Sequence, residues 1–74
     1  MMEPYENLAN AIVLFAARDY RSALKRLKKN PGGKESMRTA MKCEQFFRSG
    51  WYSALSNVSG EYLIEQLQKE VREA

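Results

Sequence analysis

The chain has 74 residues, 45% of them hydrophobic, and its 12 Lys and Arg against 9 Asp and Glu give a net charge of +3. This length predicts one domain over residues 1–74, near the lower limit at which a chain folds alone. One cysteine and no histidine exclude an internal disulfide and argue against a zinc site, so we expect no metal and no cofactor. The lone thiol, with no signal peptide and no apolar run of membrane-spanning length, predicts a soluble cytoplasmic protein that does not bind membranes.

The charges are distributed unevenly along the chain. Residues 1–17 carry two Glu and no cation, residues 18–42 carry nine cations and two acids, and residues 43–74 carry three cations and five acids. The net charges of these three segments are therefore −2, +7 and −2. A basic middle between two acidic ends is more informative about partners than the overall charge.

A long amphipathic helix is expected first, from Tyr5 to Leu27, because apolar residues recur there at i, i+3 and i+4 spacing. Pro4 suits its first position. Asn30-Pro31-Gly32-Gly33 should end the helix, because Pro31 disfavours helical geometry at Asn30 and the glycines permit a positive φ. About 25 residues at ~1.5 Å each span roughly 37 Å, whereas a compact chain of this size is about 30 Å across. The bundle is therefore either elongated or has an overhanging helix that packs against another copy, and we favour a homo-oligomer.

Two or three shorter helices are expected to follow the first. One runs from about Lys34 to Arg48, and Trp51–Leu55 is a short piece or a continuation after the Ser49-Gly50 interruption. Ser59 is a plausible N-cap for the last helix. The apolar positions of the second helix are Met37, Ala40, Met41, Cys43, Phe46 and Phe47. No segment alternates with period two, so the predicted fold class is all-α, a small helical bundle with a long N-terminal helix, a helical hairpin and a C-terminal helix.

Two rows of cations flank the turn between the first two helices. The row on the first helix comprises Arg18, Arg21, Lys25 and Lys28, and the row on the second comprises Lys34, Arg38 and Lys42. In an antiparallel hairpin these rows approach one another near the turn, and the start of the second helix adds N–H groups that favour an anion. This basic hairpin tip is the predicted anion- or partner-binding site, for nucleic acid, a nucleotide or an acidic protein face. The alternative is that these cations only keep the tip soluble and complement the helix dipole.

No catalytic signature is present in the sequence. Gly33-Lys34 resembles the end of a Walker loop, but Glu35 takes the place of the required Ser or Thr, and a helix rather than a strand precedes it. Cys43 lies midway along an apolar helix face, where a cysteine is usually a buried small hydrophobe. Without histidine the usual base for a nucleophile is missing as well. We therefore expect that the chain is not an enzyme.

The stretch FFRSGWY, Phe46 to Tyr52, gathers aromatic residues around one arginine. Such a cluster would suit RNA stacking, but in so small a protein it is more often the core and its rim. Phe46 and Phe47 are adjacent, so both cannot point fully inward from one helix. One of them, or Trp51, is therefore a candidate for a subunit interface, and Phe15, which widens the apolar face of the first helix, is another. The interface candidates are Phe15, Phe46 and Trp51.

The strings ENLANAIV, DYRSAL, CEQFFRSGWYSAL and GEYLIEQLQKEV resemble short proteins encoded by phages, prophages and mobile elements of Gram-positive bacteria. The likeness covers nearly the whole chain, from Glu6 to Val71, and implies a genomic setting without assigning a functional residue. Small helical phage proteins often act by binding, among them inhibitors of host defence. One such group forms helical oligomers that sequester cyclic-nucleotide immune signals. The stretch NPGGKESMRTAMKCE is similar to the second helix of that group but lacks the aromatic pattern that follows there.

Three functions remain open on these grounds. The first is a phage or prophage accessory protein, such as a host-defence inhibitor, that binds a protein partner or a nucleotide through the basic hairpin tip. The second is a small nucleic-acid-binding protein of a mobile element. The third is a structural or assembly component in which the basic tip has no role.

Overall fold

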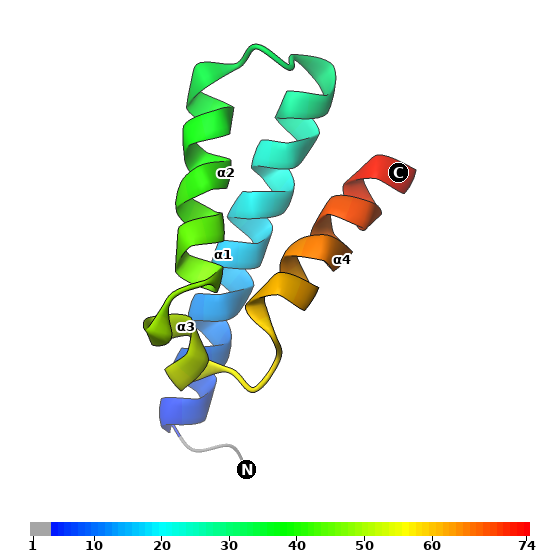
Figure 1. Cartoon of the computed structure of the whole chain (residues 1–74). Helices are drawn as coiled ribbons and strands as arrows, with labels where there is room; N and C mark the ends of the chain where they lie inside the picture. Colours follow the sequence, from blue (N-terminus) through cyan, green and yellow to red (C-terminus); the bar gives the residue numbers. More distant parts are fainter. Residues whose placement is uncertain (1–3) are drawn as a thin grey trace.

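The computed structural model describes the backbone of residues 4–74 and the side chains of residues 8–74, and it is helical throughout (Figure 1). The helices are α1 (Pro4–Lys29), α2 (Lys34–Phe47), α3 (Gly50–Leu55) and α4 (Gly60–Glu73), with no strand in the described part. The predicted all-α bundle with a long N-terminal helix is confirmed. The side chain of Tyr5, at the start of the predicted apolar stripe, lies outside the described residues.

Helices α1 and α2 form an antiparallel hairpin, closed by the turn at residues 30–33 (Figure 1). The Asn30 amide still donates to the Arg26 carbonyl at 2.8 Å, and the Gly33 amide donates to the Asn30 carbonyl at 3.0 Å. The positive φ that the glycines permit is not used, since neither Gly32 nor Gly33 has one. Helix α1 therefore ends because Pro31 disfavours helical geometry at Asn30, and not because a glycine takes a left-handed conformation.

Serine side chains begin the last two helices. The Ser49 hydroxyl accepts from the Tyr52 amide at 3.2 Å, and the Ser59 hydroxyl accepts from the Tyr62 amide at 3.3 Å. Each bond satisfies one amide that the first turn of a helix leaves without a partner. Ser59 is thus the N-cap that the sequence predicted, and Ser49 makes α3 a helix separate from α2.

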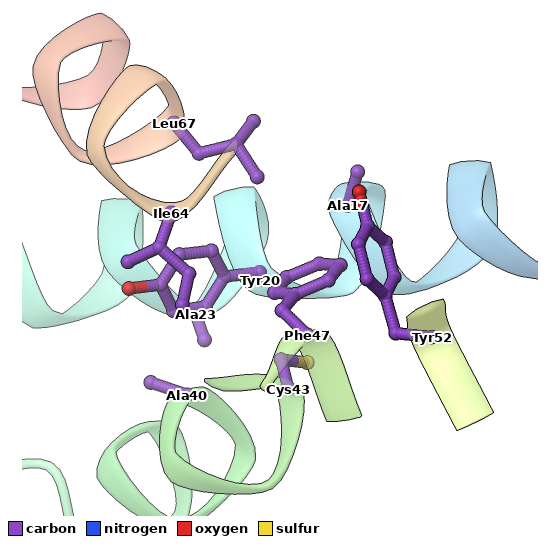
Figure 2. Close-up of a cluster of buried hydrophobic side chains, with 9 residues drawn as sticks. All are labelled: Ala17, Tyr20, Ala23, Ala40, Cys43, Phe47, Tyr52, Ile64 and Leu67. Atoms are coloured by element: carbon purple, nitrogen blue, oxygen red, sulfur yellow. The ribbon is translucent and has the colours of Figure 1, made fainter. Parts of the chain in front are cut away.

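The core lies where all four helices meet. Its largest fully buried side chains are Tyr20 of α1, Phe47 of α2 and Tyr52 of α3 (Figure 2). The Phe47 ring stands edge-on to both tyrosines, with centroids 5.8 Å from Tyr20 and 5.6 Å from Tyr52, a favourable arrangement for aromatic pairs. Small residues, Ala23 on α1 and Ala40 on α2, are buried between the hairpin helices. Ile64, Leu67 and Val71 make up the buried face of α4.

Helix α4 begins against the end of α2. A Cβ atom placed on Gly60 would lie 1.8 Å from the carbonyl oxygen of Phe47, so only glycine fits there. From this point α4 runs back along α1 toward the turn, as Figure 1 shows.

The molecule is elongated, measuring 42 × 22 × 18 Å. The length of α1, 26 residues, is therefore accommodated by the shape of the bundle. No helix in the described part has a stretch long and apolar enough to cross a membrane.

Candidate binding surface

The two predicted rows of cations have different surroundings. In the α1 row, the Arg21 guanidinium pairs with the Glu70 carboxylate of α4 at 2.5 Å. Lys28 donates from Nζ to the carbonyl oxygens of Val71 at 3.0 Å and Ala74 at 2.9 Å. Two of the four α1 cations therefore hold α4, and Lys28 complements the carbonyl end of that helix.

The other two cations of the α1 row lie on the surface. The Arg18 guanidinium carbon lies 5.1 Å from the centre of the Phe15 ring, and its Nε atom is 3.9 Å from the Asp19 carboxylate. Lys25 is exposed, and no ion pair involving it occurs among the described side chains. The α1 row is thus divided between contacts with α4 and the open surface.

The α2 row lines a hollow of about 660 Å³ beside the turn. The lining residues, called here the turn–α2 surface, are Pro31, Gly32, Gly33, Lys34, Met37, Arg38, Met41, Lys42 and Gln45. All of them belong to one helix and the turn before it, and none belongs to the α1 row. The structure therefore brings Lys34, Arg38 and Lys42 together on one hollow without the first row of cations.

Met37 and Met41 give this surface an apolar part. They are 47% and 54% exposed and lie one helical turn apart. The sequence interpretation placed both among the apolar positions of the second helix. The buried residues of α2 are in fact Ala40, Cys43 and Phe47. Helical phase alone does not separate the two groups, because Met37 and the buried Cys43 are both offset by about 60° from Ala40.

The cations of the turn–α2 surface have one acidic residue nearby in the first turn of α2, Glu35. No ion pair involving Lys34, Arg38 or Lys42 occurs in the described part of the chain. Gly33, the N-cap of α2, offers no side-chain bond to the first-turn amides. Positive side chains and the positive end of a helix dipole therefore act on the same surface.

The three aromatic residues proposed for a subunit interface differ in exposure. Phe46 is half-buried, with its ring centre 5.6 Å from that of Phe47 and 5.7 Å from that of Tyr52. Phe15 and Trp51 are each more than half exposed. Phe46 thus belongs largely to the aromatic core, whereas Phe15 and Trp51 have free surface.

Cys43 is buried, and desolvation raises the pKa of its thiol, with further contributions from the negative charges of Asp19 and Glu44. A raised pKa disfavours the thiolate, which is the nucleophilic form of cysteine. Within the described residues, no cluster of three or more His, Cys, Asp and Glu could hold a metal ion.

Comparisons of the chain with protein families, with curated proteins and with solved structures found no match in any of the three. The geometry of the turn–α2 surface is therefore the basis for a functional proposal.

Proposed function

We propose that the chain acts by binding, and that its turn–α2 surface docks an acidic, partly apolar segment of a partner protein. The observation that supports this is the side-by-side placement of exposed Met37 and Met41 with three cations that have no ion-pair partner among the described side chains. Methionine is common at binding surfaces because its flexible thioether adapts to different partners. The cations would steer an acidic partner and fix its register.

The one-sided construction of the hollow favours a macromolecule over a small ligand. Small-molecule sites usually bury most of the ligand between several walls. Here every lining residue comes from α2 or the turn before it, so a ligand would have protein on one side only. A partner helix lying along α2 could place apolar side chains on the methionines and carboxylates beside Lys34, Arg38 and Lys42.

A nucleotide is the second candidate ligand, in keeping with the resemblance to nucleotide-sequestering phage proteins. It is favoured by the start of α2, where amides without a side-chain cap lie beside Lys34 in the hollow. In the setting that the resemblance implies, the protein would act in the cytoplasm of a bacterial host, as a phage or prophage accessory protein. Of the other two functions, nucleic-acid binding would use the cations of the turn–α2 surface without its methionines. A structural or assembly component would not need these cations.

Two triple variants with equal loss of charge would test the site. Lys34→Ser, Arg38→Ser and Lys42→Ser remove three cations from the turn–α2 surface. Lys25→Ser, Arg26→Ser and Lys29→Ser remove three exposed cations of α1 that do not line the hollow. Binding would be measured by fluorescence anisotropy with three probes: an acidic amphipathic helical peptide, a cyclic dinucleotide, and random-sequence DNA.

The proposal predicts that the unaltered protein binds the acidic peptide. The α2 triple variant should have an at least tenfold lower affinity for the peptide, and the α1 triple variant should have nearly the affinity of the unaltered protein. Changing Met37 and Met41 to Gln should weaken peptide binding as well, but should leave binding of DNA through its phosphates unchanged. Equal losses in both triple variants would indicate unspecific charge attraction and contradict the proposed site. Tight binding of the cyclic dinucleotide alone would favour the second candidate.

A further inference from the structure

One end of the molecule is rich in exposed apolar side chains. Of the eight large hydrophobic residues that are exposed in the described part, five belong to the first half of α1, to α3 or to the loop after α3. This apolar end comprises Leu8, Leu14, Phe15, Trp51 and Val58. The start of α1 and helix α3 lie at the end of the bundle opposite the turn (Figure 1).

The first half of α1 is apolar on its outer face as well as its inner face. The ten residues from Leu8 to Ala17 contain no charged side chain and one polar side chain, that of the exposed Asn10. Leu8, Leu14 and Phe15 are 59%, 67% and 55% exposed, while Ala17 of the same segment is buried in the core. A helix that is hydrophobic all round is normally covered on all sides. The rest of this chain covers only one side of the segment.

The lack of charge from Leu8 to Ala17 suits a second copy of the chain as the occupant, with Arg18 at the edge of the face, over the Phe15 ring. A two-fold interface places the same surface against itself, so a charged surface would repel its own copy whereas an uncharged apolar one would not. A stable interface needs about 800 Å² on each partner, roughly one seventh of the 5646 Å² that this chain exposes. An interface of that size has to include the exposed apolar side chains along the first half of α1.

We infer that two copies of the chain pair through the first halves of their α1 helices, running antiparallel and crossing at Ala11. Ala11 lies three residues from both Leu8 and Leu14 and four from Phe15, so it is central to their outer face. Its small side chain lets two helices approach closely. Antiparallel pairing also directs the +7 segments, residues 18–42, to opposite ends of the dimer, whereas parallel pairing would place them side by side.

The dimer goes beyond the proposed binding function, because it uses the first half of α1 and none of the residues of the turn–α2 surface. Sedimentation equilibrium at micromolar concentration should give the mass of two chains for the unaltered protein. Leu14→Gln combined with Phe15→Gln should give a monomer with an unchanged helical circular-dichroism spectrum, since both side chains are exposed. Met37→Gln combined with Met41→Gln, which alters equally exposed residues elsewhere, should remain a dimer.

The crossing point has its own test. Ala11→Lys and Ala11→Glu should each be monomeric, because like charges meet at the two-fold axis, and an equimolar mixture of the two should form a dimer. A monomeric unaltered protein, or a Leu14→Gln, Phe15→Gln variant that still dimerises, would overturn the inference. A mixture that stays monomeric, with the other results as expected, would overturn the antiparallel crossing at Ala11.

Discussion

Tyr20 links three helices through its buried hydroxyl group. The hydroxyl donates to the Glu44 carboxylate of α2 at 2.8 Å and accepts from the Gln68 amide of α4 at 3.0 Å. Burial disfavours the phenolate, and together with the hydrogen bond to Glu44 it raises the pKa of Tyr20 to about 12. The folded chain therefore favours the protonated, neutral form of Tyr20 more strongly than the unfolded chain does.

This raised pKa predicts a loss of stability at high pH. Up to about pH 10 tyrosine is neutral in both the folded and the unfolded chain, and between about pH 10 and 12 only the unfolded chain loses the proton. The free energy of unfolding should fall across that window by up to about 2–3 kcal/mol from Tyr20. Urea unfolding of the unaltered protein and of Tyr20→Phe would isolate this contribution, since lysine deprotonation affects both. Equal falls in the two proteins would contradict the assignment.

The close approach of Gly60 to the Phe47 carbonyl predicts that Gly60→Ala and Gly50→Ala have opposite effects on stability. Gly60→Ala would press a methyl group into the Phe47 carbonyl and should destabilise the fold by about 1–3 kcal/mol or more. Gly50→Ala is the matched control, because nothing lies within 4 Å of a Cβ atom at that position of α3. There alanine should stabilise by roughly 0.5–1 kcal/mol through helix propensity. Chemical denaturation measures both, and equal effects would contradict the close approach at Gly60.

For single residues, the sequence predicted features that depend on near neighbours in the chain, but it did not predict tertiary contacts. The Ser59 cap and the end of α1 before Pro31 depend on residues close in the chain, so a pattern could predict them. The need for glycine at position 60 depends on Phe47, which only the packing of α4 on α2 brings near. The exposure of Met37 and Met41 likewise depends on which side of α2 the other helices cover.

Among the elements, α4 shows which forces attach a helix to the bundle. It buries Ile64, Leu67 and Val71, and it forms ion pairs through Glu61 and Glu70. The Arg21–Glu70 pair joins partly exposed side chains, a setting in which a pair contributes about 0–1 kcal/mol. Leu67→Ala should therefore cost about 2–5 kcal/mol, and Glu70→Gln less than about 1 kcal/mol. Thermal or urea unfolding compares the two, and similar costs would mean that charge holds α4.

Element boundaries followed closely from the sequence, because Pro31, Ser49 and Ser59 mark them chemically. The sequence did not predict how the two rows of cations are placed relative to each other. An antiparallel hairpin was expected to bring the rows together, but α4 packs along α1 and takes up Arg21 and Lys28. Helix periodicity gives the face on which a residue lies, whereas the helix that covers that face is a matter of tertiary packing.

For the molecule as a whole, the two proposed surfaces occupy different parts of a bundle 42 Å long: the turn–α2 surface runs from the turn along α2 to Gln45, and the apolar end includes the first half of α1 and α3 (Figure 1). The turn–α2 surface is basic, and the apolar end has no charge between Leu8 and Ala17. An antiparallel dimer would therefore carry one turn–α2 surface at each far end. Such a particle is bivalent, so its binding to a dense array of partners should exceed the affinity of a single site.

A bivalent dimer predicts a difference in affinity between dimer and monomer that appears only when the peptide is immobilised in a dense layer. In solution, the dimer and the Leu14→Gln, Phe15→Gln monomer should bind the acidic peptide with the same affinity per site, because neither substitution touches the turn–α2 surface. On a dense peptide layer the dimer should bind more tightly by on the order of a hundredfold or more, through slower dissociation. Diluting the layer until neighbouring peptides are too far apart should abolish the difference. Surface plasmon resonance at the two densities measures this, and an advantage that persists on the dilute layer would mean that the apolar end contacts the peptide itself.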